Sequence, residues 1–370
     1  MKRIVYVTQQ YPVVTETFTI KEVAGLRERG FDIDVRALRP VRRTRDLDPI
    51  GPATTVRPRA VRPLAFARAA IVAPPVHPRR ALAAVRGAAL AADLDAGRDH
   101  VHVQFPLDAS NAGLYAAASS GASFSFSGHT YHELDLMQTK LRRARFVTVG
   151  SDFERELLCR RYGDRWRDRI HVRRLGVPER AARRAFVPGT IVSVGTLTGK
   201  KGHAVLIRAV AELGPHVRLE ILGEGPERAE LERLVAQLSL DSRVSLPGSL
   251  PHEEALDRVS RAEVFALACR ETEDGDHDCL PVALMDAMSL AVPCVSSDAF
   301  GIPELIDDGR SGLLAPAGDH VAVAERLELL LRDAGRRDEV GAGGQAAVRG
   351  RFDLERNLDG LAELFRAELG

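Results

Sequence analysis

The feature that most constrains the fold of this chain is a repeated alternation of short apolar runs with segments of helical periodicity. Residues 3–8 form a β-branched run that is typical of a buried strand. Residues 15–30 carry an apolar stripe at helical spacing that ends at Gly30, and residues 31–38 alternate as a second strand. Since a strand, a helix and a strand in this order usually form a parallel pair, the sequence predicts an α/β fold with a parallel sheet.

The pattern continues in two series, which are separated by an aperiodic segment at residues 181–189. We expect further strands over residues 100–105, 124–127, 145–150, 170–173, 190–195, 217–222, 244–246, 264–267, 293–296 and 313–314. A length of 370 residues allows two or three domains that each bury a core. We therefore predict a first domain over residues 1–185, a second over 186–351, and a final helix over 352–370 that joins the first domain.

The four cysteines are scattered, with no Cys-x-x-Cys pair and no paired His ligands. This argues against a zinc site and a disulfide framework, and favours a reducing compartment. The N-terminal apolar run, residues 4–7, is too short for a signal peptide, and no run approaches the roughly 20 apolar residues of a membrane-spanning helix. We expect a cytoplasmic protein, with the inner face of the membrane as the alternative location.

Charge is distributed unevenly, although the net charge is only +1. Residues 1–185 hold 33 Lys and Arg against 19 Asp and Glu, whereas residues 186–370 hold 19 against 32. The basic half suits attraction to the acidic half across a cleft, contact with anionic lipid, or binding of a phosphorylated acceptor. The alternative is that an Arg-rich composition produced this distribution by chance. We expect helices over residues 62–72 and 80–94. They suit binding to a membrane surface, and the alternative is that their apolar faces pack on the core. Nucleic acid is not expected, because no aromatic residues are interleaved with the arginine clusters.

One stretch carries most of the chemistry, an acidic loop that ends at Asp278 and is followed by Leu280-Pro281, which opens a helix. The N–H groups at a helix start suit an anion. The carboxylates of Asp278 and Asp286 would repel that anion, so they are better placed to accept hydrogen bonds from hydroxyls. An anion together with hydroxyls describes a nucleotide sugar. The alternative is an acidic surface loop before a core helix.

Two other places offer side chains to such a ligand. Lys200 and Lys201 stand between glycines just after a predicted strand, where they suit phosphate, although the spacing is not that of a P-loop. His129 follows a strand at the edge of the sheet where ligands bind. His100 and His102 lie within a strand, so we interpret them as a structural pair rather than as metal ligands.

At this point the chain resembles the retaining family 4 glycosyltransferases, particularly those of bacterial exopolysaccharide biosynthesis. The resemblance covers nearly the whole chain. It rests on motifs in order and spacing, namely Pro12 with Thr15-Glu16-Thr17-Phe18, His100-x-His102-x-x-Phe105, His129, Gly195 with Lys200-Lys201-Gly202, Gly223-Glu224-Gly225-Pro226, Asp278-Cys-Leu280-Pro281 with Asp286-Ala-Met288, and Gly301-Ile-Pro-Glu304.

The resemblance implies a GT-B fold, in which two Rossmann-like parallel-sheet domains face a cleft and the donor lies mostly in the second. Lys201 then matches the lysine that holds the diphosphate, Asp286 the carboxylate on the ribose, and Asp278 the carboxylate on the transferred sugar. The implied donor-binding set is Gly195, Thr196, Lys201, Gly223, Glu224, Asp278, Cys279, Leu280, Pro281 and Asp286; the acceptor-side set is Thr15, Glu16, Thr17 and His129. Lys201, Asp278 and His129 are the implied catalytic residues.

The implied activity is retaining transfer of a sugar from a nucleoside diphosphate to a hydroxyl of a glycan, lipid-linked or small-molecule acceptor. No cofactor and no metal are expected. The chain departs from the family where Asp278 and Asp286 replace glutamates, where Cys279 replaces a glycine, where Thr196 replaces an arginine and where His132 replaces an acidic residue. The alternatives are a non-catalytic partner subunit that binds sugar nucleotides, and another GT-B enzyme such as a nucleotide-sugar epimerase. A phosphorylase is not supported, because the chain is too short.

Overall fold

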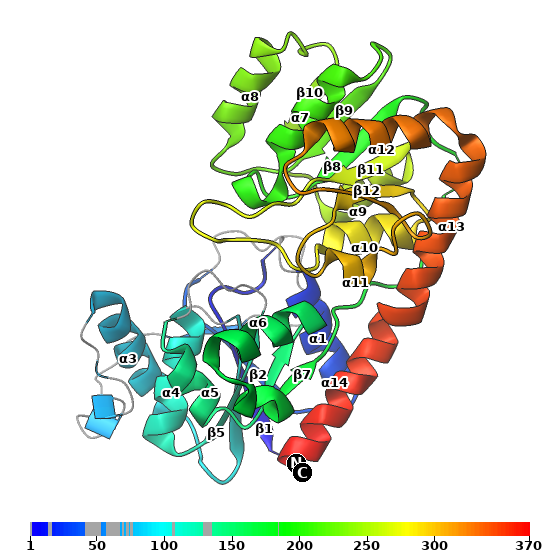
Figure 1. Ribbon diagram of the computed structural model, residues 1–370. Coiled ribbons are helices and arrows are strands. Elements are labelled where there is room, and N and C mark those ends of the chain that lie inside the picture. The colour runs from blue at the N-terminus through cyan, green and yellow to red at the C-terminus, as the bar shows by residue number, and fades with distance from the viewer. Residues whose placement is uncertain are drawn as a thin grey trace. The chain divides into compact units, whose positions relative to one another are not determined.

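The computed structural model of the protein describes residues 2–13, 17–40, 53–56, 67–68, 70–71, 74, 77–105, 108–128, 135–183 and 185–370. The chain forms two compact units, each an α/β arrangement around one parallel sheet (Figure 1). The first unit comprises Met1–Arg173 and Glu355–Gly370, and the second comprises Arg174–Leu354.

The first unit is built on a parallel sheet of seven described strands in the order β3-β2-β1-β4-β5-β6-β7. The strands are β1 (Arg3–Thr8), β2 (Ile33–Ala37), β3 (Thr54–Thr55), β4 (Asp99–Gln104), β5 (Ser123–Gly128), β6 (Val147–Val149) and β7 (Ile170–Val172). The helices are α1 (Thr17–Glu28), α3 (Pro78–Ala91), α4 (Asp108–Ser120), α5 (Met137–Arg143), α6 (Asp152–Tyr162), the 3-10 helix η2 (Asp164–Arg169) and α14 (Leu354–Leu369).

Helix α14 supplies part of the core of the first unit, although it lies at the other end of the chain. Phe365 on α14 is fully buried and packs edge-on against Phe146, with ring centroids 5.3 Å apart, and against Phe31 at 6.0 Å. Gly25 on α1 provides the close approach, because a Cβ there would lie 2.3 Å from a methyl group of Leu358. The amphipathic pattern of residues 354–369 is therefore explained by burial within the first unit.

The second unit is built on a parallel sheet of six strands in the order β10-β9-β8-β11-β12-β13. The strands are β8 (Thr190–Val194), β9 (Arg218–Leu222), β10 (Val244–Gly248), β11 (Val264–Leu267), β12 (Cys294–Ser297) and β13 (Leu313–Ala315). The helices are the 3-10 helix η3 (Gly199–Lys201), α7 (His203–Glu212), α8 (Arg228–Gln237), α9 (His252–Ser260), α10 (Val282–Ser289), α11 (Ile302–Leu305), α12 (His320–Arg332) and α13 (Ala334–Arg351).

Both faces of the second sheet are buried. Neighbouring residues of β8 point to opposite faces, so that Ile191 joins a core with α7, α8 and α12, whereas Val192 joins a core with α9, α10 and α11. Burial on two faces explains why the strands read as continuous apolar runs and not as alternating ones. The predicted strands and the parallel arrangement are confirmed.

The segment from Arg174 to Gly189 differs from the prediction, which placed a linker at residues 181–189 and a domain boundary at 185. It packs on the second unit instead. The Arg183 N–H donates to the Leu290 carbonyl at 2.9 Å, the Val187 N–H donates to the Arg261 carbonyl at 2.8 Å, and Val177 pairs with Asp353. The partners in these hydrogen bonds are distant in sequence, so the local pattern of residues 181–189 does not reveal them. The segment has no periodicity of its own, and it was therefore predicted to be a linker.

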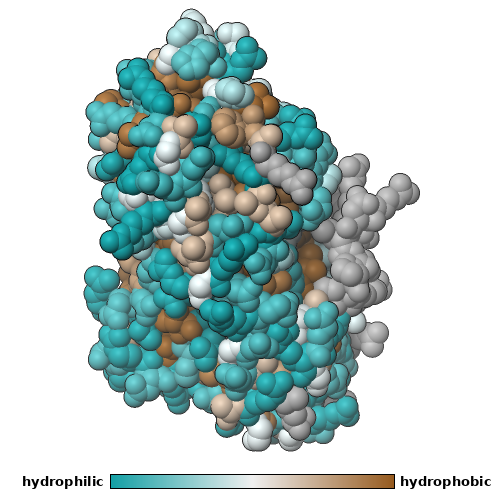
Figure 2. All heavy atoms as spheres, turned by 90° about the vertical axis from the view of Figure 1, so that its right-hand side faces the viewer, coloured by the Kyte–Doolittle hydropathy of each residue, from teal (hydrophilic) through white to brown (hydrophobic). Residues whose placement is uncertain are grey.

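The molecular face in Figure 2 is covered mainly by hydrophilic residues, with apolar residues in small scattered groups. Among the described helices, none combines the length and the apolar character needed to cross a bilayer.

Candidate functional site

The residues of the predicted donor site lie at the carboxyl edge of the second sheet, around the point where the strand order reverses. From β8 the chain adds β9 and β10 on one side, and β11, β12 and β13 lie on the other. Lys201 follows β8 and Asp278 follows β11, and these are the two strands that flank the reversal. In open parallel sheets, ligands bind outside the carboxyl ends of the strands at this position.

The loop after β8 folds tightly enough to hold Lys201 against the backbone. Gly202 adopts φ 67°, and a Cβ there would lie 1.7 Å from the Ala268 carbonyl oxygen, so only glycine fits. A Cβ on Gly195 would lie 3.2 Å from Cδ of Lys201, so the absence of a side chain at Gly195 leaves room for the lysine stem. The glycines that the sequence placed around the two lysines are therefore explained by these close approaches.

Lys201 and Asp278 meet in an ion pair between Nζ and Oδ2. Burial lowers the Lys201 pKa, but attraction to Asp278 outweighs it, and the net pKa lies above its usual value. Burial raises the Asp278 pKa, but the charge and hydrogen bond of Lys201 outweigh it, and the net pKa lies below its usual value. Both groups are therefore charged at neutral pH, and the ammonium that suits a phosphate is held by a carboxylate.

The loop after β9 packs directly on the loop after β8. A Cβ on Gly223 would lie 1.9 Å from the Gly195 carbonyl oxygen, and the Leu197 N–H donates to the Glu224 carbonyl at 3.0 Å. The Glu224 carboxylate pairs with Arg228 at 2.8 Å. Glu224 therefore contributes its backbone to this loop packing, while its side chain is directed to the next helix.

Helix α10 begins directly after the acidic loop. Pro281 is its N-cap residue and makes no side-chain cap hydrogen bond. Cys279 and Leu280 are buried beside it, and Asp286 lies in the middle of α10 with 6% of its surface exposed. The structure therefore places the N-cap three residues and the first helical residue, Val282, four residues after Asp278, one residue later than the predicted opening at Pro281, and keeps Asp286 close to the core.

The remaining predicted residues are Thr196, Thr17 and four that the structure does not describe. Thr196 is exposed in the loop after β8, and Thr17 is the first residue of α1 in the first unit. Thr15, Glu16, His129 and His132 lie outside the described residues.

His100 and His102 form the structural pair that the sequence suggested. Each imidazole lies in the sheet between serine hydroxyls of β5, with Ser125 within 2.7 Å of both His100 Nε2 and His102 Nδ1. Ser123 and Ser127 complete the pair at 2.8 and 3.0 Å. Both nitrogens of each ring are thus satisfied within the core.

Two contacts of the acidic loop were not predicted. Lys200 pairs with Asp276 at 3.1 Å, and the His277 ring stacks on Phe300 with centroids 4.4 Å apart. The sequence does hold a signal for the ion pairs, because two adjacent lysines, Lys200 and Lys201, can pair with two aspartates of the Asp-x-Asp segment. No sequence signal links His277 to Phe300, which follows a different strand.

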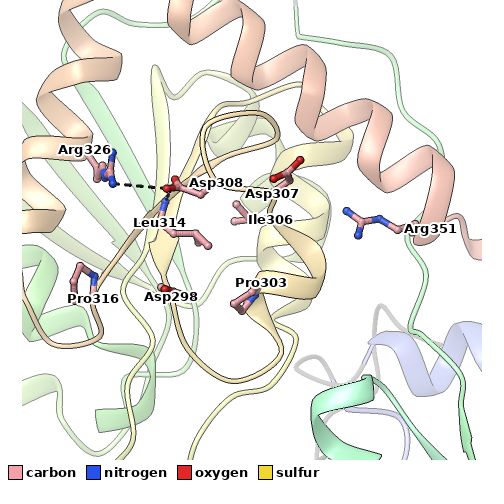
Figure 3. A pocket seen from close by; sticks show the side chains of 9 residues that line it. All are labelled: Asp298, Pro303, Ile306, Asp307, Asp308, Leu314, Pro316, Arg326 and Arg351. Carbon is pink, nitrogen blue, oxygen red and sulfur yellow. Dashed lines mark hydrogen bonds and ion pairs between the residues drawn. The ribbon is translucent and has the colours of Figure 1, made fainter.

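A separate cavity of about 720 Å³ lies at β12 and β13 of the second unit (Figure 3). It is lined by Asp298, Pro303, Ile306, Asp307, Asp308, Leu314, Pro316, Arg326 and Arg351. Asp308 is held inside it by the Leu314 N–H at 2.8 Å and by Arg326 at 3.7 Å. None of these nine residues belongs to the predicted donor set. Across the described part of the chain, no group of three or more His, Cys, Asp or Glu side chains is arranged to hold a metal ion.

Comparison with known proteins gives this geometry a context. Residues 185–347 match the family model "Glycosyl transferases group 1". Over 169 residues the chain is 40% identical to the putative colanic acid biosynthesis glycosyltransferase WcaL of Escherichia coli K12, covering 44% of this chain and 42% of WcaL. Over 168 residues it is 40% identical to the amylovoran biosynthesis glycosyltransferase AmsK of Erwinia amylovora, covering 43% of this chain and 41% of AmsK.

Whole-chain similarity appears at the level of structure. The Anabaena protein HepE, crystallised with UDP and glucose, superposes with a TM-score of 0.78 at 17% identity, covering 99% of this chain and 100% of HepE. The chain has the GT-B fold and resembles the family 4 glycosyltransferases. The Thermosynechococcus elongatus sucrose-phosphate synthase shares this GT-B fold with a TM-score of 0.72 at 17% identity, covering 99% of each chain.

The matched family region contains every residue of the predicted donor set, because it includes both Gly195 and Asp286. The alignments span less than half the length of the curated relatives. The predicted GT-B fold is confirmed by the structural neighbours.

Proposed function

We propose that this protein is a retaining glycosyltransferase that moves a sugar from a nucleoside diphosphate donor to a hydroxyl of a glycan, lipid-linked or small-molecule acceptor. The observation that carries the proposal is the ion pair of Lys201 with Asp278 at the strand reversal of the second sheet. A cation is positioned there on a rigid loop, next to a helix start and beside a carboxylate. This set matches a diphosphate and the hydroxyl groups of a sugar.

The similarity to HepE supports a nucleotide ligand, since HepE was crystallised with UDP and glucose. The similarity to WcaL and AmsK supports a role in the synthesis of a polysaccharide. We therefore use UDP as the ligand with which nucleotide binding is measured in the tests below.

The proposed mechanism begins with an exchange of partners. When the donor binds, its diphosphate takes the Lys201 ammonium from Asp278, and the released carboxylate accepts hydrogen bonds from the sugar hydroxyls. As the bond between the anomeric carbon and the phosphate oxygen breaks, negative charge develops on the leaving diphosphate. Lys201 and the N–H groups at the start of α10 then stabilise that charge.

The acceptor hydroxyl attacks the anomeric carbon from the face that the diphosphate leaves, which retains the anomeric configuration. The leaving phosphate takes the proton of the acceptor hydroxyl. We propose that the first unit supplies the acceptor side, where His129 and Glu16 would position the acceptor, and that its basic charge draws the protein to an anionic membrane surface.

The test is the Lys201→Ala variant. A hydrogen bond to a charged group contributes about 1.5–3 kcal/mol, so UDP affinity should fall about tenfold to a hundredfold, measured by calorimetry, and sugar transfer should be lost. Arg208→Ala removes a cation from an exposed position of α7 and serves as the matched control.

A Lys201→Ala/Asp278→Asn double variant removes both charges, so it separates lost binding from misfolding caused by an unpaired buried carboxylate. Unchanged UDP affinity in a folded Lys201→Ala protein would refute the phosphate role. Tight UDP binding by the wild type without transfer to any acceptor would favour the non-catalytic alternative.

A further inference from the structure

The acidic loop after β11 contains a turn that is closed by its own hydrogen bonds. The Thr272 N–H and the Thr272 hydroxyl each donate to the Asp276 carbonyl at 2.9 Å, and the Gly275 N–H donates to the Thr272 carbonyl at 2.9 Å. Gly275 adopts φ 82°, a conformation that glycine tolerates. The turn therefore delivers the next residues, His277 and Asp278, in a defined direction.

One side of this turn is held by the loop after β8. The Lys200 ammonium lies 3.1 Å from Oδ2 of Asp276, and each side chain is 20% exposed. The Arg270 N–H also donates to the Lys200 carbonyl at 3.0 Å. These contacts tie the start and the end of the turn to the segment that carries Lys201.

The other side is held by an aromatic stack. The His277 and Phe300 rings are nearly parallel, with an interplanar angle of 14° and centroids 4.4 Å apart, and His277 Nδ1 donates to the Gly275 carbonyl at 3.0 Å. Phe300 adopts φ 57°, which non-glycine residues rarely do. The backbone two residues earlier is held by the Asp298 N–H, which donates to the Ala315 carbonyl at 2.8 Å. Phe300 therefore follows a segment that is anchored to β13.

We propose that His277, Phe300 and Asp276 are positioning residues that hold the Asp278 carboxylate at the donor. This deepens the proposed function and rests on it. An aspartate has one methylene between backbone and carboxylate, so the carboxylate position follows the backbone closely. The stack and the Lys200 ion pair hold the two residues immediately before Asp278, His277 and Asp276.

The first measurement needs no turnover. Hydrogen exchange of the amides of residues 272–278 should become about threefold to tenfold faster in His277→Ala and in Phe300→Ala, because each variant removes one ring of the stack. His277→Phe keeps a stacked ring but loses the Nδ1 hydrogen bond to Gly275, so its exchange rate should lie between those of the wild type and His277→Ala. His216→Ala, at an exposed position before β9, is the matched control. Wild-type exchange in His277→Ala would overturn the proposal.

The second measurement separates positioning from general loss of structure. His277→Ala and Phe300→Ala should lower kcat about tenfold or more, since a small displacement of a reacting group has effects of this size. UDP affinity should stay within about twofold, because Lys201 is unchanged. The double variant should lose little more than either single variant, because both remove the same stack. An unchanged kcat in both single variants would overturn the proposal.

The two proposals fail in different ways. If the wild type turns over no donor in a panel of nucleoside diphosphate sugars, the proposed function is contradicted. The exchange rates of His277→Ala, His277→Phe and His216→Ala then still decide whether the stack holds the turn.

Discussion

Glu22 shows how a single buried side chain couples the first unit to pH. It lies on α1 with 9% of its surface exposed, and the Tyr6 hydroxyl is 2.6 Å from its Oε1. Burial raises the pKa of Glu22 to about 7, and the hydrogen bond from Tyr6 only partly opposes this shift. The folded protein therefore keeps a proton on Glu22 at pH values where the unfolded chain has released it.

This difference fixes the sign of the pH dependence. From about pH 4.5 to 7 the folded state binds more protons at Glu22 than the unfolded state, so stability falls as pH rises, and it levels off above the folded pKa. Relative to Glu22→Gln, the wild type should lose about 3 kcal/mol of unfolding free energy across this window. Urea unfolding followed by Trp166 fluorescence measures it, because the single tryptophan lies in the first unit.

The matched control for this prediction is Glu28→Gln at an exposed position of the same helix, which should leave the pH dependence as it is in the wild type. Parallel pH profiles of the wild type and Glu22→Gln would contradict the prediction.

At the scale of elements, β4 and β5 are joined by a ladder of side-chain hydrogen bonds in addition to the backbone ladder. The ladder runs through Ser123, His100, Ser125, His102 and Ser127, and its last hydroxyl lies 2.7 Å from Thr148 on β6. Burial lowers the pKa of His100 well below its usual value. The His100 imidazole in the ladder is therefore neutral, with a hydroxyl at each nitrogen.

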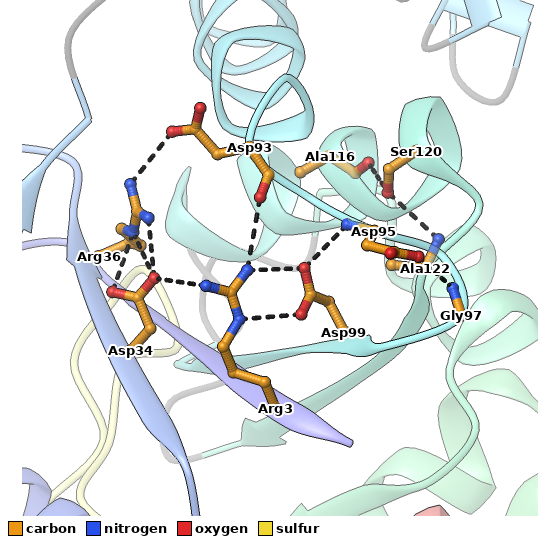
Figure 4. Close-up of polar contacts among 10 residues, drawn as sticks. All are labelled: Arg3, Asp34, Arg36, Asp93, Asp95, Gly97, Asp99, Ala116, Ser120 and Ala122. Carbon is orange, nitrogen blue, oxygen red and sulfur yellow. Dashed lines mark hydrogen bonds and ion pairs between the residues drawn. The ribbon is translucent and has the colours of Figure 1, made fainter.

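Ser125 is the shared member of the ladder, so its loss affects two rings at once. Ser125→Ala should lower the free energy of unfolding by about 3 kcal/mol, because two buried imidazole nitrogens lose their partner. Ser120→Ala is the matched control, since the Ser120 hydroxyl donates to the Ala116 carbonyl at 2.9 Å and accepts from the Ala122 N–H at 3.2 Å, both near the end of α4 (Figure 4). Trp166 fluorescence in urea compares the two, and equal losses would contradict the prediction.

The amino edge of the first sheet is held together by ion pairs. Arg3 bonds Asp99 through two contacts of 2.9 and 2.7 Å and lies 3.7 Å from Asp34, while Arg36 joins Asp34 at 2.8 Å (Figure 4). Asp99 is fully buried, so its pairing with Arg3 offsets a large desolvation cost.

Helices and strands could be predicted from the sequence where one face was apolar or where residues typical of caps and turns marked the ends. Ser151 caps α6 in a capping box with Glu154, and a serine three residues before a glutamate is the usual sequence signal for such a box. Helix α4 was not predicted, because it is buried on nearly all sides and has no polar stripe.

In the site, Lys201 and Asp278 were identified separately, but their ion pair was not predicted, because it depends on how two loops pack.

At the scale of the whole molecule, the first unit is completed by residues from both ends of the chain. Phe365→Ala should destabilise that unit by about 3–5 kcal/mol, because it opens a cavity among buried rings. Urea unfolding monitored at Trp166 measures the loss. Glu363→Ala, an exposed position on α14, is the control and should change stability little. A Phe365→Ala protein as stable as the control would contradict this account of the core.

The position of α14 also has a consequence for the order in which the protein is made. Every residue of the second unit, Arg174–Leu354, leaves the ribosome before Glu355–Gly370. The core of the second unit thus contains no residue of the last segment, whereas the core of the first must wait for Phe365. Although domains usually fold in the order of their synthesis, here the unit that starts first is the one that finishes last.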